Sequence, residues 1–225
     1  MRMRRIVWLG AVVLSTTAAA SPGAIDPTHF VRDVSNAWYP LPRGSQAVFR
    51  GTESGQPSRD VVTVLRGTKS ILGVPCVVVS DNLYVRGRLR ERTRDWYAQD
   101  VKGNVWYFGE DTAELDESGR VTSREGSWRA GVNGAKPGIV MPGRPRVGQS
   151  FRQEFSKGHA EDHFRILSLS AHVSTPFVSS ARAMETVEWS PLEPNVREHK
   201  YYVRGIGNVA VPADHQVLVS YRRYS

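Results

Sequence analysis

Short segments rich in Val, Thr, Tyr and Trp alternate with turns containing glycine or proline along most of the chain. This spacing predicts β-strands joined by tight turns. No window of ten or more residues has a clean 3.6-residue apolar repeat, so we expect little helix, with residues 26–37 as the candidate. The predicted strands are residues 46–51, 61–71, 74–85, 88–99, 104–110, 113–116, 120–128, 149–156, 164–172, 183–189, 197–203, 208–211 and 216–224.

Three turn sequences predict hairpins, at Arg86 and Gly87, at residues 100–104 and at residues 117–119. Each includes a residue that tolerates positive φ, which tight hairpin turns require. The strands that flank the second turn place apolar side chains on both faces, as strands do when both faces are covered. The fold class we predict is therefore all-β, an antiparallel meander that forms a barrel or sandwich of calycin-like or similar type.

Residues 130–148 interrupt the strand pattern with closely spaced glycines and prolines. Long irregular segments are uncommon in compact domains and often carry function. We expect a lid or rim loop here, with a passive connection as the alternative. The apolar residues Ile139, Val140 and Met141 indicate that part of the segment packs onto the domain.

The N-terminus carries Arg2, Arg4 and Arg5, then the apolar residues 6–14, then three alanines that end at Ala20. That order is typical of a secretory signal peptide, and the apolar run is too short for a spanning helix. We expect residues 1–20 to be removed, residues 21–40 to form an extension, and residues 41–225 to form one domain. The expected location is secreted or periplasmic, without a permanent membrane span; an uncleaved anchor is the alternative.

The chain has a single cysteine, Cys76, within the apolar run of residues 74–79. An internal disulfide is therefore excluded, and a buried small hydrophobe is the expected role. The formal net charge of +8 includes the three N-terminal arginines, and the other basic residues are dispersed, so we expect no nucleic-acid partner.

One dense basic run stands out, with arginines at every second position from Arg86 to Arg94. A period of two predicts that all five side chains share one face of a strand. We interpret this face as solvated; the alternatives are a contact for an anionic surface polymer, for a phosphate-bearing envelope lipid or for nucleic acid.

Aromatic residues concentrate in the middle and near the end of the chain, where they either fill the core or line a pocket. Small-ligand sites are mostly apolar with a few polar groups that orient the ligand. The candidate ligand-binding residues are Asp95, Tyr97, Gln99, Trp106, Tyr107, Trp128, Met141, Arg152, Glu154 and Lys200.

No motif points to catalysis or to a cofactor. His159 and His163 flank two carboxylates, but a strand or loop would separate them and the spacing differs from the zinc-protease motif, so a solvated turn is favoured. Carboxylate pairs for glycoside hydrolysis could be drawn from a set that shows no preferred pair. That set is Asp95, Asp100, Glu110, Asp111, Glu125 and Glu154.

Several motifs resemble those of an uncharacterised family of exported bacterial β-rich proteins. They are DWYAQD at 95–100, GNVWYFGE at 103–110, EGSW at 125–128, PGIVMP at 137–142, GQSFRQE at 148–154 and EHKYY at 198–202. The resemblance covers roughly residues 36–211 and implies export and a shared β-rich fold, but no activity.

Our leading functional hypothesis is an exported, non-catalytic domain that binds a small or amphiphilic ligand, or an envelope component. One alternative is a hydrolase that acts on envelope polymer. The other is a structural or protein-interaction module.

Overall fold

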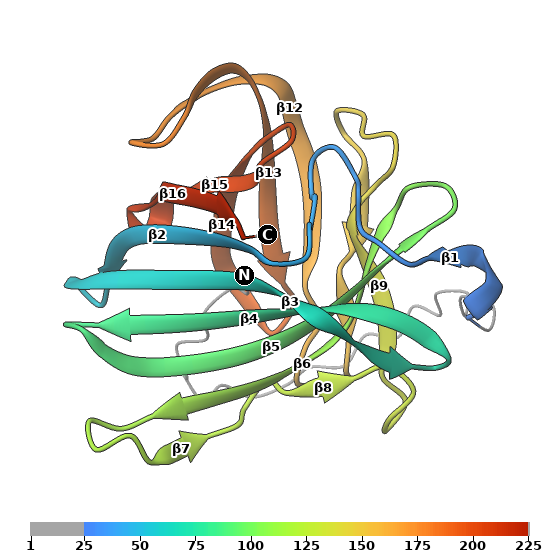
Figure 1. Ribbon diagram of the computed structural model, residues 1–225, viewed down its shortest axis with the longest axis horizontal. Helices are drawn as coiled ribbons and strands as arrows, with labels where there is room; N and C mark the ends of the chain where they lie inside the picture. Colours follow the sequence, from blue (N-terminus) through green and yellow to red (C-terminus); the bar gives the residue numbers. More distant parts are fainter. Residues whose placement is uncertain (1–24, 225) are drawn as a thin grey trace.

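The structure is a computed structural model that describes residues 25–224, and its fold is all-β (Figure 1). Two 3-10 turns, η1 (Pro27–His29) and η2 (Pro212–Asp214), accompany the strands. The strands are β1 (Phe30–Val31), β2 (Ser45–Glu53), β3 (Gln56–Ile71), β4 (Val74–Val85), β5 (Arg88–Asp100), β6 (Val105–Leu115), β7 (Val121–Ser123), β8 (Trp128–Arg129), β9 (Lys136–Met141), β10 (Ser150–Arg152), β11 (Glu154–Phe155), β12 (His163–Ser174), β13 (Ser179–Ser190), β14 (Glu193–Val203), β15 (Gly207–Val211) and β16 (Gln216–Arg223).

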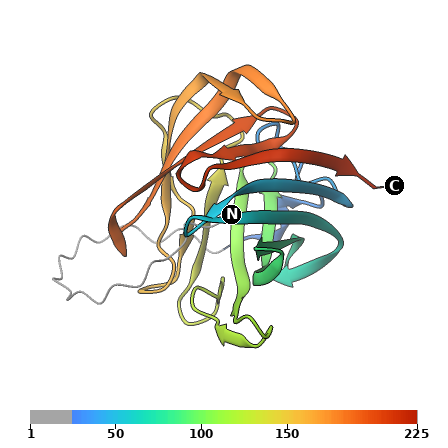
Figure 2. The same cartoon turned by 90° about the vertical axis from the view of Figure 1, so that its left-hand side faces the viewer.

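The antiparallel meander predicted from the sequence is confirmed. From β2 to β6 each strand pairs with the next one in the chain, and the same holds from β12 to β16. The hairpin at Arg86 and Gly87 has φ values of 51° and 77°, the positive pair that a two-residue hairpin turn requires. Figure 1 shows β2–β4 nearly horizontal, β6 oblique and β12 and β13 nearly upright, and Figure 2 shows the same strands from the side.

The strand path nearly closes into a barrel at residues 150–155. Thirteen strands follow one another in hydrogen-bonded order, and the two ends of that order are β10 and β11. These two strands are separated in the chain only by Gln153. Because β10 pairs with β12 and β11 pairs with β9, one short segment connects both edges of the sheet.

Within residues 26–37, where the sequence allowed a short helix, the structure has one 3-10 turn. Only the single turn η1 forms there, with Pro27 at its start and the Asp26 carboxylate accepting a hydrogen bond from the Thr28 backbone N–H. The segment then extends as β1, which pairs with the end of β5, and Phe30 packs edge-on against Trp106 and Phe108. Residues 25–41 therefore lie against the barrel, while the predicted signal peptide lies outside the described residues.

The glycine- and proline-rich segment 130–148 is not one continuous loop, contrary to the sequence interpretation. Its central residues form β9, which pairs with both β6 and β11. Gly138 allows this close pairing, because a Cβ at that position would lie 2.6 Å from the Gln153 carbonyl carbon. Met141 is fully buried in the core, so the centre of the segment is a barrel strand rather than a lid.

The arginine run does not share one face, contrary to the period-two prediction. Leu83 pairs with Glu91 but the next residue, Tyr84, pairs with Leu89, so Arg90 is the extra residue of a β-bulge. The bulge shifts the alternation by one position. Arg88 and Arg90 line a groove with Glu91 and three other glutamates, whereas Arg92 and Arg94 line a separate hollow.

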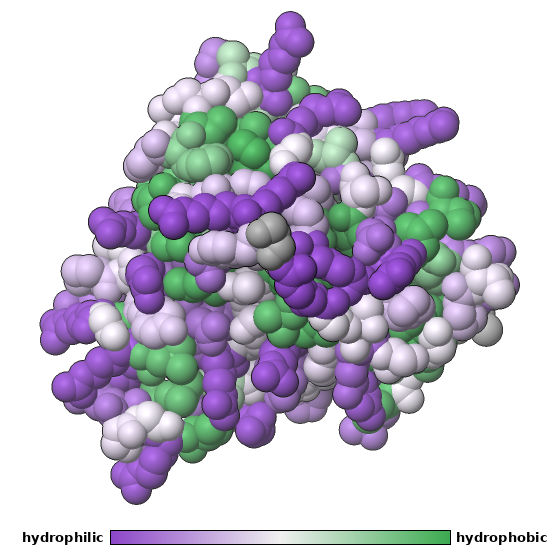
Figure 3. All heavy atoms as spheres, viewed as in Figure 1, coloured by the Kyte–Doolittle hydropathy of each residue, from purple (hydrophilic) through white to green (hydrophobic). Residues whose placement is uncertain are grey.

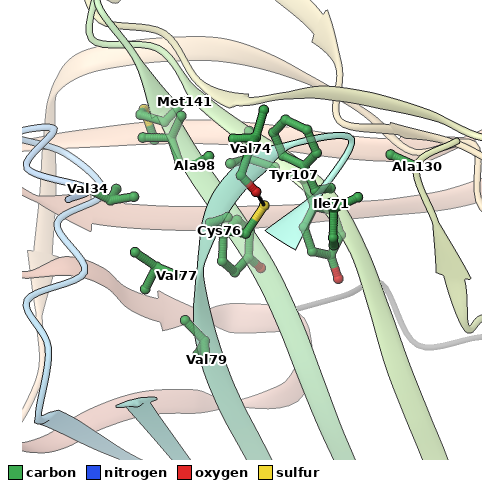
Figure 4. Close-up of a cluster of buried hydrophobic side chains, with 14 of the residues drawn as sticks. Val34, Ile71, Val74, Cys76, Val77, Val79, Ala98, Tyr107, Ala130 and Met141 are labelled. Atoms are coloured by element: carbon green, nitrogen blue, oxygen red, sulfur yellow. Dashed lines mark hydrogen bonds between the residues drawn. The ribbon is translucent and has the colours of Figure 1, made fainter. Parts of the chain in front are cut away.

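The main hydrophobic cluster surrounds Cys76, whose side chain is fully buried (Figure 4). Its Sγ donates to the Val74 carbonyl oxygen at 3.6 Å, and burial raises the pKa of the thiol to about 12. The expected role as a buried hydrophobe is confirmed. On the face shown in Figure 3, hydrophilic side chains predominate and apolar patches are small.

The near-closure of the barrel makes Gly138 a sensitive position. We expect Gly138→Ala to lower the free energy of unfolding by about 2 kcal/mol, because the added methyl group overlaps the backbone of the adjoining strand. Gly67→Ala in β3 is the control, since a Cβ there has no heavy atom within 4 Å. Urea unfolding of both variants measures the difference, and equal stabilities would contradict the proposed tight contact between β9 and residues 152–153.

Candidate functional site

The register of β4, β5 and β6 directs two rows of side chains into the barrel. Val77, Tyr97 and Tyr107 are cross-strand neighbours in one row. In the next row Val79, Asp95 and Glu110 are neighbours. All six side chains are buried. The inner surface of β4–β6 therefore carries both tyrosine rings and carboxylate groups.

The aromatic rings of this surface form a connected group. Tyr97 and Tyr107 stack with centroids 4.7 Å apart, and Tyr39 from the N-terminal segment lies 5.4 Å from Tyr97. The Tyr107 hydroxyl donates to Asp95 Oδ1 at 2.5 Å. Trp128 meets Tyr107 edge-on at 5.4 Å.

Burial raises the pKa of Tyr97 and of Tyr107 well above the ordinary tyrosine value, and the nearby carboxylate of Asp95 raises both further. Their hydroxyl groups therefore keep their protons at neutral pH. The protonated Tyr107 hydroxyl can therefore serve as the donor to Asp95.

Trp128 is oriented by a second buried carboxylate. Its Nε1–H donates to Glu154 Oε2 at 2.7 Å. Glu154 belongs to β11, at the segment that nearly closes the barrel, whereas Trp128 belongs to β8. This hydrogen bond therefore ties the closing segment to the aromatic group.

The opposite wall provides one buried cation. Lys200 of β14 is 3% exposed, and its ammonium group lies 2.6 Å from Glu188 and 3.1 Å from Glu198. Burial alone would lower the pKa of Lys200, but the two carboxylates outweigh it and hold the pKa well above the usual value. Lys200 is therefore charged, and it partly neutralises the acidic interior.

Two small cavities, each partly open to solvent, lie along the inner side of the barrel wall. The polar cavity has a volume of about 40 Å³, close to the roughly 30 Å³ that one water molecule occupies in the liquid. Its lining comes from both halves of the barrel. The lining residues are Tyr39, Tyr97, Tyr107, Val140, Gln153, Glu154, Asp162, Glu188, Lys200, Tyr202 and Asn208.

The apolar cavity has a volume of about 90 Å³ and shares Tyr39, Tyr97 and Asn208 with the polar one. Aliphatic and aromatic side chains make up most of its wall, and Ser45, Asp81 and Asn208 are among its few polar groups. The remaining lining residues are Pro40, Leu41, Ala47, Phe49, Val62, Val64, Val79, Ile206, Gly207 and Tyr221.

Six of the ten candidate residues meet in this interior. Tyr97, Tyr107, Glu154 and Lys200 line the polar cavity. Asp95 and Trp128 are hydrogen-bonded to lining residues.

The other four candidates lie elsewhere. The Gln99 side-chain carbonyl accepts from the backbone N–H groups of Ser35 and Asn36, and so holds the N-terminal segment. Trp106 donates to Asp100 at 2.9 Å. Met141 is buried in the core, and the Arg152 guanidinium lies over the Phe155 ring at 4.5 Å.

Sequence reasoning missed several residues that line the cavities. Tyr39 and Leu41 precede the first long strand, and no local pattern indicates that they enter the barrel. Glu188 and Asn208 come from strands that reach this site only through the barrel topology. The alternation of β13, in which Met184, Thr186 and Glu188 are all buried, was a usable signal for Glu188.

The geometry gives little support to glycoside hydrolysis by paired carboxylates or to a metal site at His159 and His163. Asp95, Glu110 and Glu154 are buried, but the cavity beside Glu154 is too small for a sugar ring, and Asp111 and Glu125 are exposed. His159 lies 3.4 Å from Glu125, while His163 stacks on Trp189. Within residues 25–224, no group of three or more histidine, cysteine, aspartate or glutamate side chains could hold a metal ion.

The chain was compared with protein-family models, with curated proteins and with solved structures, and none of them matches it. The family resemblance drawn from the sequence motifs stays a prediction. In the part of the chain that the structure describes, no helix has the length and apolar character needed to cross a membrane.

Removal of the buried ammonium group of Lys200 should destabilise the protein. We expect Lys200→Met to lower the free energy of unfolding by about 3 kcal/mol or more at pH 7, because Glu188 and Glu198 would remain buried without their cation. The triple variant that also carries Glu188→Gln and Glu198→Gln removes these charges and should recover part of the loss. Urea unfolding of both variants tests this, and a triple variant no more stable than the single one would contradict it.

Glu198 should make stability depend on pH. Burial raises its pKa above the usual 4.5, with Lys200 opposing the shift. Below pH 4.5 the carboxyl is protonated in both states; as the pH rises through the folded-state pKa, the native protein must hold a desolvated charge and loses stability.

Relative to the wild type, Glu198→Gln should therefore become more stable as the pH rises from 4.5 toward neutrality. Unfolding curves measured at several pH values give this difference. Glu117→Gln, at a carboxylate that is 80% exposed, is the control. A Glu198→Gln difference that is constant with pH would contradict the assignment.

Proposed function

We propose that this protein is a non-catalytic binding protein that holds a small amphiphilic molecule inside its barrel. The observation that carries the proposal is the apolar cavity of about 90 Å³, which adjoins a polar cavity through Tyr39, Tyr97 and Asn208. An apolar wall with a few polar groups at one place is the usual composition of a small-ligand site.

The arrangement of the two cavities supports a definite orientation of the ligand. The apolar part would lie against Phe49, Val62 and Val64, because these side chains line only the apolar cavity. The polar group would lie toward Tyr39 and Asn208, which reach both cavities. The volumes favour a ligand smaller than a typical drug-sized molecule, whose pockets measure about 300–1,000 Å³.

The proposed setting is outside the cytoplasm. The order of basic, apolar and small residues within positions 1–20 supports export. The isolated, buried Cys76 also fits an oxidising compartment, since its raised pKa and burial protect the thiol from oxidation.

The proposal is tested by titrating the full chain with p-cresol, followed by chemical shift changes of backbone amides. We expect saturable binding with the largest shifts in β2, β3 and residues 39–41. Toluene has the same ring but lacks the hydroxyl, so it should bind more weakly if the polar end of the cavity contributes.

A matched pair of alanine substitutions locates the site. Ala47 lines the apolar cavity, and Ala47→Leu fills it, so affinity for p-cresol should fall by about tenfold or more while stability is maintained. Ala181 is exposed on β13, and Ala181→Leu should bind as the wild type does. No binding of either probe to the wild type, or equal binding by both variants, would overturn the proposal.

A further inference from the structure

Arg92 and Arg94 lie on the outer face of the sheet, away from the cavities. Arg94 pairs across the strands with Ser80 on β4 and with Asp111 on β6. Arg92 pairs in the same way with Asn82 and Ala113. Both arginines are exposed, so this part of β5 presents two guanidinium groups to solvent.

These side chains surround a hollow of about 290 Å³. A third arginine, Arg124, reaches the same hollow from the segment after β7, and its guanidinium forms an ion pair with Asp111 at 2.9 Å. In the described chain, no hydrogen bond or ion pair occupies the guanidinium groups of Arg92 and Arg94. The hollow therefore has three cations and a single carboxylate.

Polar donors complete the hollow. The Asn82 side-chain amide donates to Ser80 Oγ at 3.2 Å, which leaves the Ser80 hydroxyl proton available to another acceptor. A guanidinium group presents several N–H donors in one plane, which suits the oxygens of a phosphate group. The size of the hollow allows a phosphate together with the group that it esterifies.

We propose that this arginine hollow, lined by Ser80, Asn82, Arg92, Arg94, Asp111 and Arg124, binds a phosphate group carried by an ester. The proposal is independent of the cavities inside the barrel. It gives the expected contact with an anionic envelope component a specific location, on two of the five arginines of the run rather than on all of them.

The contrast with the neighbouring groove supports this location. Arg86, Arg88 and Arg90 line a larger groove of about 870 Å³ together with Glu53, Glu91, Glu114 and Glu117. There the negative groups outnumber the arginines, so that groove has no excess positive charge for an anion. The β-bulge at Arg90 separates the two environments.

The experiment titrates the full chain with inorganic phosphate and with glycerol 3-phosphate, and records amide shifts at low salt. We expect saturable shifts in β4, β5 and β6 around Arg92 and Arg94, and weaker binding as sodium chloride is added. Arg92→Gln combined with Arg94→Gln should lower the affinity by about tenfold or more.

The chain itself offers a matched control. Arg88→Gln combined with Arg90→Gln removes the same charge from the same strand, but on the groove side, and should change the affinity by less than about twofold. Asp111→Asn removes the only carboxylate of the hollow and should raise the affinity by about threefold.

Vesicles distinguish the source of the phosphate group. Binding to phosphatidylglycerol vesicles that depends on Arg92 and Arg94, with none to phosphatidylcholine vesicles, supports the proposal and identifies a lipid headgroup. Binding of glycerol 3-phosphate alone also supports it and identifies a soluble ester. The proposal is overturned if the wild type binds neither phosphate probe nor the anionic vesicles, or if both double variants lose affinity equally.

Discussion

A β-sheet that returns to its own first edge must satisfy the backbone hydrogen bonds of both edges at one place, and here residues 150–155 do so. The first half of this segment pairs with β12 and the second half with β9. Because the sheet is nearly closed, one face of every long strand becomes an interior. The narrow interior limits the size of the side chains that face it. At Gly138, where β9 meets residues 152–153, there is no space even for a Cβ atom.

The interior of the barrel also contains charged side chains, and each of them needs a polar partner. Buried carboxylates lie on both walls, and the ammonium group of Lys200 lies within 3.1 Å of two of them. Charges of this kind are stable in a protein interior only with close, well-oriented partners. The tyrosine hydroxyls and the Trp128 indole N–H complete this polar network, in which the Tyr107 and Trp128 donors are assigned to Asp95 and Glu154. The side chains leave two small cavities, one polar and one apolar. The proposed ligand would place its polar group toward the first and its apolar part in the second.

Much of the fold could be predicted from the chain, because strand positions depend on local alternation and on turn residues. β4 forms at its predicted bounds, and the hairpin at Arg86 and Gly87 follows directly from the residue that tolerates positive φ. Of the residues that line the polar cavity, the sequence pointed to Tyr97, Tyr107, Glu154 and Lys200, each of which lies in or beside an aromatic motif. Tyr39, Glu188 and Asn208 join it through barrel closure, which brings together segments far apart in the chain and leaves no local pattern. Gln99 and Trp106 lie outside the two cavities, because their polar atoms bond the N-terminal segment and the turn after β5.

The bulge at Arg90 makes the surface of the β4–β5 hairpin respond differently to substitutions and to changes in length. A run of alternating arginines encodes a uniform surface only while the register of the strand is unbroken, and one extra residue divides it between a mixed-charge groove and a basic hollow. Substitution of any one arginine alters a single surface. Insertion of one residue within the paired part of this hairpin would shift the alternation beyond it and turn those side chains to the opposite face, so variation in length is more disruptive here than variation in residue type.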